Sequence, residues 1–463
     1  MKKRISYVRI AWLMMVVSLV LSHCVTKDDY LTNHFLFSIA VLVAYILCIV
    51  SWCKLGGRLL SLYVFFVAYA FFSNAGQSFL YSLGVHDTIM YTYEHESIGD
   101  ITRMLRFQLL CVAALNLGVC LYMSKHRIVN ISELRDHYIQ SQSKSNTFDG
   151  FLDLLMYVSV AYVAAMCVNM FVMRQAMDYG DFFQAGRGES ANYFSGFFDF
   201  LSIVLPVRCL FKKRHITFVY LSYFFFISLF MLVGSRGLAI RYLALTLVFL
   251  PMTHPYLFAK KYIAIWIIGI MFGFAGLSVI SASRSSALSL SGFNSSNSLL
   301  IGVFNTIDEM GNSARPAVLS MTEIDATLGH KQTILYTIVC GFIPFTSTIP
   351  YFQEQYIYLG EYLTNVVGSF SGLGSSCIGE CYLNYGWLGW IFMLFYGYAV
   401  AWGENTAYKK ILRGDYLIAL FLFAILSRQV AFGRSEFLRL APLFRTIEIV
   451  FIITFFFRKR YWK

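Results

Sequence analysis

Apolar runs long enough to cross a bilayer follow one another along most of this chain, and they constrain its fold more than any other feature. A membrane-spanning helix needs about 20 mainly apolar residues. The runs of suitable length lie near 8–25, 35–53, 59–83, 105–123, 151–173, 196–210, 216–233, 238–253, 262–282, 381–402, 417–433 and 440–457. The pattern therefore predicts an all-α polytopic membrane protein with about 12 transmembrane helices.

The composition excludes a water-soluble domain. The 463 residues are 58% hydrophobic, 18% aromatic and only 13% charged, and the mean hydropathy is +0.62. A soluble domain needs many more charged residues, so we expect the bilayer to be the solvent. The net charge of +12 is that of many nucleic-acid-binding proteins. Its cations, however, form short clusters between apolar runs, as orientation in a membrane requires, and we expect no nucleic-acid partner.

These clusters also predict the orientation. The first run follows a basic start and no small-x-small cleavage site follows it, so we expect an uncleaved span with a cytoplasmic N-terminus. Every second loop is then cytoplasmic and basic, and the C-terminus is cytoplasmic as well. The cytoplasmic clusters begin at Lys2, Lys54, Lys125, Lys212, Lys260, Lys409 and Arg458. The sequence thus predicts a multi-pass membrane protein with both termini in the cytoplasm.

The stretch 283–380 is the one long segment that a membrane would not accommodate. It carries seven acids together with several aromatic residues that are able to pack. Long connections in compact proteins are usually functional or disordered, and the aromatic residues favour a folded cap. We expect three regions, namely spans 1–9 in 1–282, a large external loop folded as a cap in 283–380 and spans 10–12 in 381–463.

The cations predicted to lie on the external face are nearly all arginines. A guanidinium grips phosphate with two parallel hydrogen bonds and stays charged when buried. In the turn Gly234-Ser235-Arg236-Gly237 the next helix begins beside Arg236, and a helix N-terminus with an arginine favours an anion. Ion pairs with nearby acids are the alternative interpretation. The candidate phosphate-binding residues are Arg187, Arg236, Arg241, Arg284, Arg434 and Arg439.

Metal chemistry and disulfides have weaker support. His86 and His95 do not have the spacing of a zinc site, and we expect neither a metal ion nor another cofactor. Cys377 and Cys381 lie one helical turn apart, which is a poor geometry for a disulfide, so we expect apolar packing roles for them.

Two segments carry a family resemblance. Gly374-Ser375-Ser376-Cys377-Ile378-Gly379-Glu380-Cys381-Tyr382-Leu383-Asn384-Tyr385-Gly386-Trp387-Leu388-Gly389, together with the turn at 234–237, resembles the O-antigen polymerase family of the Wzy type. In that family a Gly-Ser-Arg-Gly turn precedes a large periplasmic loop, and a Gly-Glu-x-Tyr-x-Asn segment follows it. The sequence departs from paired Arg-x10-Gly motifs of some members, because Ala185 and Phe198 stand where glycine is needed.

The resemblance implies a GT-C-like glycosyltransferase that works without a metal. It also implies a bacterial inner membrane, with the 283–380 cap and the external arginines in the periplasm. Such an enzyme transfers a growing glycan from undecaprenyl pyrophosphate onto an incoming lipid-linked repeat unit, and a chain-length regulator is an expected partner besides membrane lipids. Fixed cations would stabilise the pyrophosphate leaving group. A carboxylate or histidine would accept the proton of the acceptor hydroxyl, with Glu380 as the first candidate and His330 as the second. A salt bridge is the alternative for Glu380.

Two other functions remain open. An O-antigen ligase shares the layout but passes the glycan to the lipid A core. A transporter of the lipid-linked oligosaccharide belongs to a different class, and transporters often carry inverted repeats and broken helices. The sequence contains no such repeat and has its one large loop at a single place, which argues against a transporter.

Overall fold

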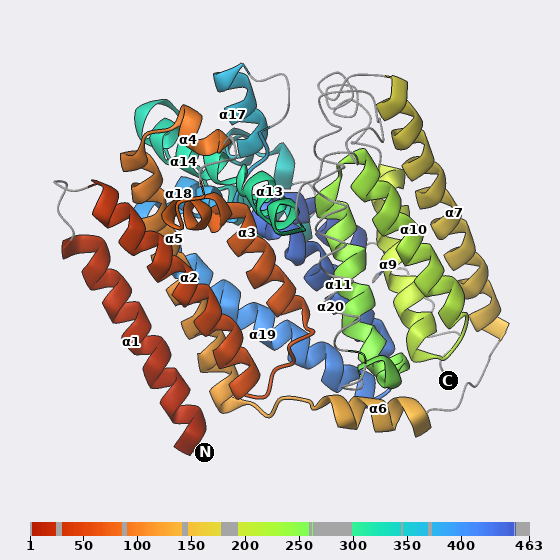
Figure 1. Ribbon diagram of the computed structural model, residues 1–463. Coiled ribbons are helices and arrows are strands. Elements are labelled where there is room, and N and C mark those ends of the chain that lie inside the picture. Colours follow the sequence, from red (N-terminus) through yellow and green to blue (C-terminus); the bar gives the residue numbers. More distant parts are fainter. Residues whose placement is uncertain are drawn as a thin grey trace.

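The computed structural model describes residues 2–24, 30–85, 90–140, 147–176, 193–258, 262, 299–343, 346–368, 373–448 and 450. All regular secondary structure within these residues is helical (Figure 1). The expected all-α class is therefore confirmed. The ninth expected span, 262–282, lies outside the described residues apart from its first position, and so do residues 449 and 451–457 of the twelfth.

Ten long helices account for the other expected spans. They are α1 (Lys2–Cys24), α2 (Tyr30–Lys54), α3 (Leu62–Ser82), α5 (Ile98–Lys125), α7 (Thr147–Ala176), α9 (Tyr193–Phe211), α10 (Ile216–Val233), α11 (Arg236–Thr253), α19 (Trp390–Leu412) and α20 (Tyr416–Val430). Within the described part of the chain, seven helices are long and apolar enough to cross a membrane, namely α1, α2, α5, α7, α10, α11 and α20. The chain is thus a multi-pass membrane protein, and the total of twelve spans stays a prediction.

Helix α5 is the centre around which α1, α2 and α19 pack. Nearly all its residues from Ile101 to Met123 are buried. Two glycines bring α5 and α19 close together, because a Cβ on Gly118 would lie 2.0 Å from the Leu394 carbonyl oxygen and one on Gly397 would lie 2.3 Å from that of Leu115. Small residues allow helix backbones to approach in this way inside a membrane.

The lysine-rich connections meet at the end of the bundle that holds the N-terminus. Arg4 Nη1 donates to the His126 carbonyl oxygen at 3.1 Å, and Asn405 Oδ1 accepts from the Val129 amide at 3.2 Å. Helix α6 (Ile131–Gln140) runs across the same end (Figure 1). The structure therefore gathers on one side connections that we expect to be cytoplasmic. Which side of the membrane they face stays a prediction.

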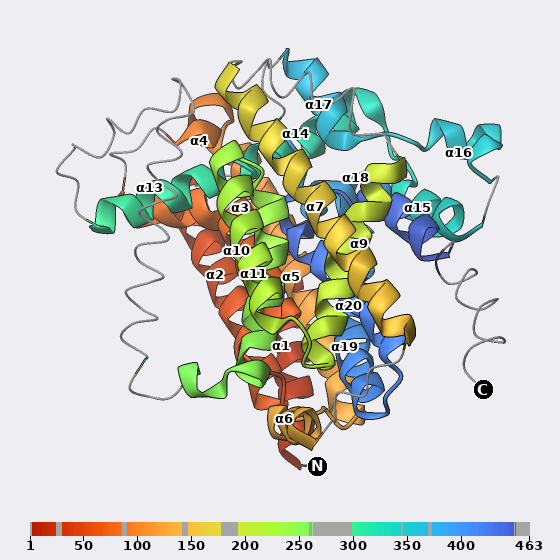
Figure 2. The same ribbon diagram turned by 90° about the vertical axis from the view of Figure 1, so that its right-hand side faces the viewer.

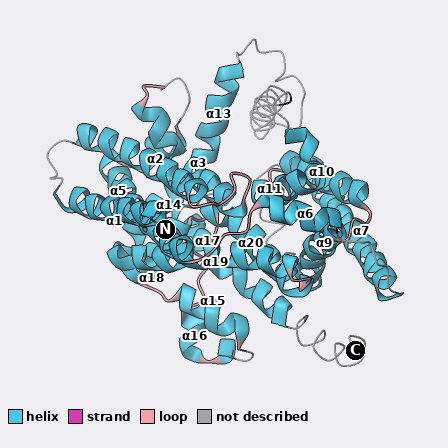
Figure 3. Cartoon of the chain, turned by 90° about the horizontal axis from the view of Figure 1, so that it is seen from below, coloured by secondary structure: helices cyan, strands magenta, loops and turns pink. Residues whose placement is uncertain are grey.

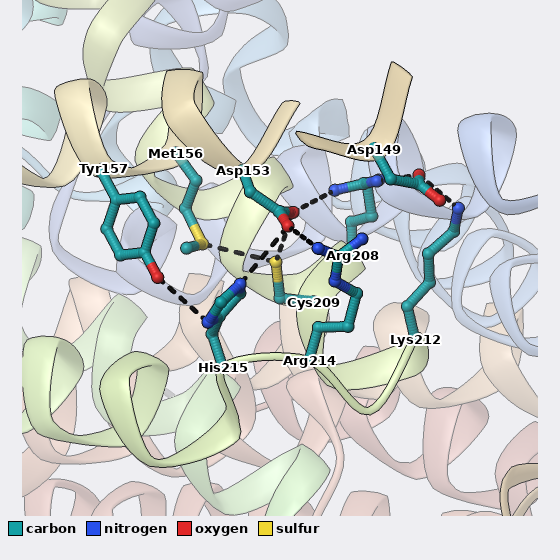
Figure 4. A network of polar contacts seen from close by, with 9 residues as sticks. All are labelled: Asp149, Asp153, Met156, Tyr157, Arg208, Cys209, Lys212, Arg214 and His215. Carbon is teal, nitrogen blue, oxygen red and sulfur yellow. Dashed lines mark hydrogen bonds and ion pairs between the residues drawn. The ribbon is translucent and has the colours of Figure 1, made fainter. Parts of the chain in front are cut away.

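An ionic network ties α7, α9 and the start of α10 together (Figure 4). Arg208 near the end of α9 donates to Asp153 Oδ1 at 3.0 Å and also to Asp149. Lys212 lies 2.6 Å from Asp149 Oδ1, and Arg214 lies 2.5 Å from Asp153 Oδ2. The basic cluster after α9 is thus neutralised in part by two acids at the beginning of α7.

Short helices form a folded cap over the other end of the bundle (Figures 1 and 2). They are α13 (Leu299–Gly311), α14 (Ala314–Glu323), α15 (Thr333–Phe342), α16 (Pro350–Glu354) and α17 (Leu359–Val367). The small α4 (Tyr91–His95) joins them, since Arg315 Nε of α14 lies 2.9 Å from Glu96 Oε1 just after α4. The described part of 283–380 is therefore packed and helical.

The single span expected at 381–402 is divided in the structure. Helix α18 (Cys377–Tyr385) ends at Gly386, the turn η6 (Gly386–Gly389) follows, and α19 begins at Trp390. Gly386 has φ +54°, which favours glycine. A Cβ on Gly389 would lie 2.3 Å from the Cys381 carbonyl oxygen. The prediction of one helix here was wrong. The residues of the turn are mostly apolar, so the hydropathy of the segment does not reveal the break.

Candidate functional site

Three segments that are distant in sequence meet beside α3 at the capped end. The turn 234–237 before α11 lies against η7 (Ala431–Arg434), since a Cβ on Gly237 would be 3.8 Å from Ala431 Cβ. Asn74 on α3 donates to the Gly433 carbonyl oxygen at 2.7 Å, and its Oδ1 accepts from Ser376 Oγ at 2.5 Å. Both segments that carry the family resemblance therefore belong to one site.

A buried carboxylate near this site holds two arginines. Asp199 on α9 accepts two hydrogen bonds from Arg241, at 2.8 and 3.1 Å, and one from Arg428 at 2.6 Å. The Arg241 side chain is only 2% exposed, whereas that of Arg428 is 27% exposed. Two guanidinium groups on one carboxylate leave one net positive charge. Ionisable groups within a membrane domain are costly and usually functional.

Arg236 connects the membrane helices to the cap. Its guanidinium donates to Glu309 Oε1 on α13, and both side chains are largely buried. The ion pair that the sequence left open as the alternative is thus present for Arg236, as it is for Arg241. An anion that binds here would have to share the arginines with their carboxylates or displace the carboxylates.

Asp308 lies next to Glu309 and is held by an amide of α3. Gln77 Nε2 donates to Asp308 Oδ1 at 2.8 Å and to Asn312 Oδ1 at 2.6 Å. Burial raises the pKa of Asp308 to about 6, and Glu309 adds to the shift. Asp308 and Gln77 were not among the residues predicted for the site. Asn74 and Gln77, three residues apart in an otherwise apolar span, were the available signal for a polar site on this face of α3.

Glu380 is enclosed by backbone donors. Its Oε1 accepts from Thr333 Oγ1 at 3.0 Å and from the Leu438 amide at 3.2 Å, and its Oε2 accepts from the Phe437 amide. The side chain therefore caps the short helix η8 (Phe437–Leu440) and is 1% exposed. Burial, and then the neighbouring Glu436 carboxylate, raise the pKa of Glu380 to about 8.

Glu436, in the segment between η7 and η8, attaches this segment to the cap. Its two oxygens accept from the amides of Leu359, at 2.9 Å, and Gly360, at 3.0 Å, which open α17. Burial raises the pKa of Glu436 as well. The two carboxylates thus anchor residues 431–440 to α18 and to the cap. That connection carries the predicted Arg434 and Arg439.

The remaining predicted residues occupy more open positions. Arg434 ends η7 and is partly exposed. Arg439 on η8 is exposed, with its guanidinium carbon 5.7 Å from the centre of the Tyr358 ring. His330 is exposed at the edge of the cap, with Nδ1 3.2 Å from the Leu383 carbonyl oxygen. Arg187 and Arg284 lie outside the described residues.

The structure brings the predicted residues together in two groups. Arg236, Arg241 and Arg434 belong to α11 and to the η7 segment that packs on it. Glu380 caps η8, the short helix that carries Arg439. In the part of the chain that the structure describes, no group of three or more His, Cys, Asp or Glu residues is placed to hold a metal ion. Cys377 and Cys381 are free and buried, as expected from their spacing.

These features define a class, namely multi-pass helical membrane proteins with a folded cap over a site rich in arginine–carboxylate pairs. The chain belongs to the O-antigen polysaccharide polymerase Wzy family, whose family model matches residues 8–463. This confirms the resemblance inferred from the two short segments, and it places the protein among the O-antigen polymerases of lipopolysaccharide biosynthesis. No curated protein and no solved structure matched the chain.

Proposed function

We propose that this protein lengthens O-antigen at the periplasmic face of the inner membrane. The acceptor hydroxyl of an incoming lipid-linked repeat unit bonds to the anomeric carbon of the growing glycan. The bond from that carbon to undecaprenyl pyrophosphate breaks, and the pyrophosphate leaves with the electron pair. The proton of the hydroxyl passes to a side chain of the protein. Family membership supports the polymerase role, and the side chains of the capped site support this mechanism.

The observation that carries the mechanism is the shared carboxylate of Asp199. Arg241 and Arg428 both bind it, so one positive charge there is not neutralised by the pair itself. A pyrophosphate that gains charge as its bond breaks is stabilised by such fixed cations, and no metal is needed for that effect. We propose that Arg236, Arg241 and Arg434 contribute to this stabilisation, together with Arg187, Arg284 and Arg439.

The proton acceptor is a separate part of the proposal. Glu380 and His330 remain the candidates. The contacts of Glu380 also support a positioning role. Both its oxygens accept backbone hydrogen bonds from η8, which carries Arg439. His330 is the more accessible of the two.

A deletion strain tests the function against its alternatives. Loss of a polymerase leaves core-lipid A capped with a single repeat unit, because a separate ligase still acts. Loss of a ligase removes the cap altogether, and loss of a transporter leaves the repeat unit on the cytoplasmic side of the membrane. We expect single-unit capping, detected by electrophoresis of the lipopolysaccharide, and long chains restored by the intact gene. Unchanged long chains in the deletion strain would refute the proposal.

A further inference from the structure

One part of the expected water-facing cap has the composition of a membrane segment. No charged residue occurs between Lys331 and Glu354, a run of 22 residues. The helix formed there, α15, has 10 residues. At 1.5 Å per residue it is about 15 Å long, half of the roughly 30 Å needed to cross the hydrocarbon core. Apolar helices of this length are typical of buried cores or of segments that lie in a membrane interface.

The outward face of α15 is apolar. Tyr336 and Cys340 face inward and pack with Leu438 of η8. On the opposite side, Ile338 is 47% exposed and Phe342 is 48% exposed. Leu335 extends the same stripe at a spacing of three residues, which keeps it on one face of the helix. A buried core helix would cover this stripe.

The exposed apolar surface continues beyond α15. Ile343, Ile349 and Tyr351 are each exposed by about half of their surface (53%, 45% and 51%). Helices α15 and α16 project from the side of the bundle next to α18, as the views in Figures 2 and 3 both show. We refer to the described residues 333–343 and 346–354 as the arm.

The arm is joined to the start of the last expected span. The rings of Phe342 and Phe444 stack with their centres 4.5 Å apart. Arg445 Nε donates to the Cys340 carbonyl oxygen at 3.0 Å. Residues 441–448 are helical and open the apolar run 440–457. The outward stripe of α15 therefore lies beside the start of an expected membrane span.

We propose that the arm lies in the membrane interface on the cap side, with the apolar stripe of α15 buried in the lipid leaflet. Tyrosines and arginines prefer the headgroup level. The hydroxyl group of Tyr356 donates to that of Tyr358 at 2.7 Å, and Arg439 lies over the Tyr358 ring. These polar groups surround the base of the arm. An interfacial helix with this division of side chains binds a bilayer through its apolar face.

The arm then sets the depth of the site in the membrane. Leu438 of η8 packs against the arm, and Glu380 caps η8 from α18. The arm thus keeps Arg439 at the level of lipid phosphates. On the proposed function, the pyrophosphate of a lipid-linked substrate lies at this same level. The position of the arm does not itself depend on that function.

Spin labels at matched sites test the proposal. Single cysteines replace Ile338, Phe342 and, as the control, Val366 in an otherwise cysteine-free full-length chain, and each is labelled in lipid nanodiscs. Val366 is an apolar residue of the cap helix α17 and is 46% exposed, so it matches the test positions in exposure. Accessibility to molecular oxygen and to a water-soluble nickel chelate is then measured at each label.

We expect the labels at 338 and 342 to be reached well by oxygen and at least 5-fold less by the nickel chelate than the label at 366. Equal nickel access at all three positions would place the arm in water and overturn the proposal. Low access to both reagents at 338 and 342 would show a protein contact, such as a second copy, and would overturn it too. None of these measurements uses polymerase activity. A result against the interfacial position of the arm is therefore distinct from a result against the proposed function.

Discussion

At the scale of single residues, an arginine of the site that binds a carboxylate is able to serve as a structural ion pair or as part of a pyrophosphate clamp. Arg236 binds Glu309, which is enough to hold α13 on α11 and is also compatible with a pyrophosphate clamp. The two roles differ in what geometry they require. A clamp needs the planar fork of guanidinium, whereas an ion pair tolerates the ammonium group of lysine.

We expect Arg236→Lys to reach normal membrane levels and yet to lower the polymerisation rate roughly 10²–10³-fold, by analogy with the loss of one donor to a developing anion. Glu309→Gln is the matched control, because it removes the ion pair and leaves the arginine. It should retain most of the activity. The measurement is the length of the glycan chains formed over time from purified lipid-linked repeat units. Equal losses in both variants would show that Arg236 serves only to hold Glu309.

Asp308 should give the stability a characteristic pH dependence. Its pKa is about 6 in the folded protein, against 3.8 for an unperturbed aspartate. Between these values the folded protein binds more protons than the unfolded chain, so the free energy of unfolding contributed by this group falls as the pH rises from about 4 to about 6. Asp308→Asn should remove that part of the slope. Thermal unfolding in nanodiscs across this pH range, compared between the two proteins, measures it, and identical profiles would contradict the assignment.

The predictable and unpredictable parts of the site differ for a physical reason. Arginines at the ends of apolar runs stand out in a sequence because charge is costly there. Their partners do not, since Asp199 and Arg428 are 229 residues apart and meet only after folding. The sequence therefore indicated Arg236 and Arg241, but not the acids that hold them.

At the scale of elements, the short connection from η7 to η8 depends on Glu380. This carboxylate accepts the two amides that open η8. Hydropathy could not reveal such a cap, because the bonds join segments 57 and 58 residues apart. The break between α18 and α19 also escaped prediction, since it lies in backbone angles such as φ +54° at Gly386 while the residues of the turn are mostly apolar.

Glu380→Gln separates a positioning role from proton transfer. The amide nitrogen of glutamine cannot accept a backbone N–H, so one buried donor loses its partner at a cost of about 1–3 kcal/mol. If Glu380 positions η8, we expect a lower unfolding temperature with part of the polymerisation retained. Unchanged stability with complete loss of activity would instead identify a proton acceptor. Thr333→Val is the control, because it removes one hydrogen bond to the same carboxyl group and leaves the carboxylate.

At the scale of the whole molecule, the distribution of lysine and arginine agrees with the arrangement of the helices. The connections after α2 and α5 and the second half of α19 meet at one end, and the cap covers the other. This division is predictable because successive loops lie on alternate sides of the membrane. One span more or fewer would place the later basic loops on the side of the cap. The packing of the cap was not predictable in detail, because it depends on contacts such as that between Gln77 and Asp308.

The orientation itself is open to a direct measurement. We expect the basic end to face the cytoplasm, because positively charged loops are retained there. A cysteine in place of Ala326, an exposed residue of the cap, should react with a membrane-impermeant thiol reagent in intact spheroplasts. A cysteine in place of Ser132, which is exposed on α6 at the basic end, should react only after the membrane is permeabilised. A reporter fused after Arg413 should likewise behave as cytoplasmic. The opposite labelling pattern would invert the protein and place the cap, with its arginines, on the side where no lipid-linked polymer is assembled in the proposed reaction.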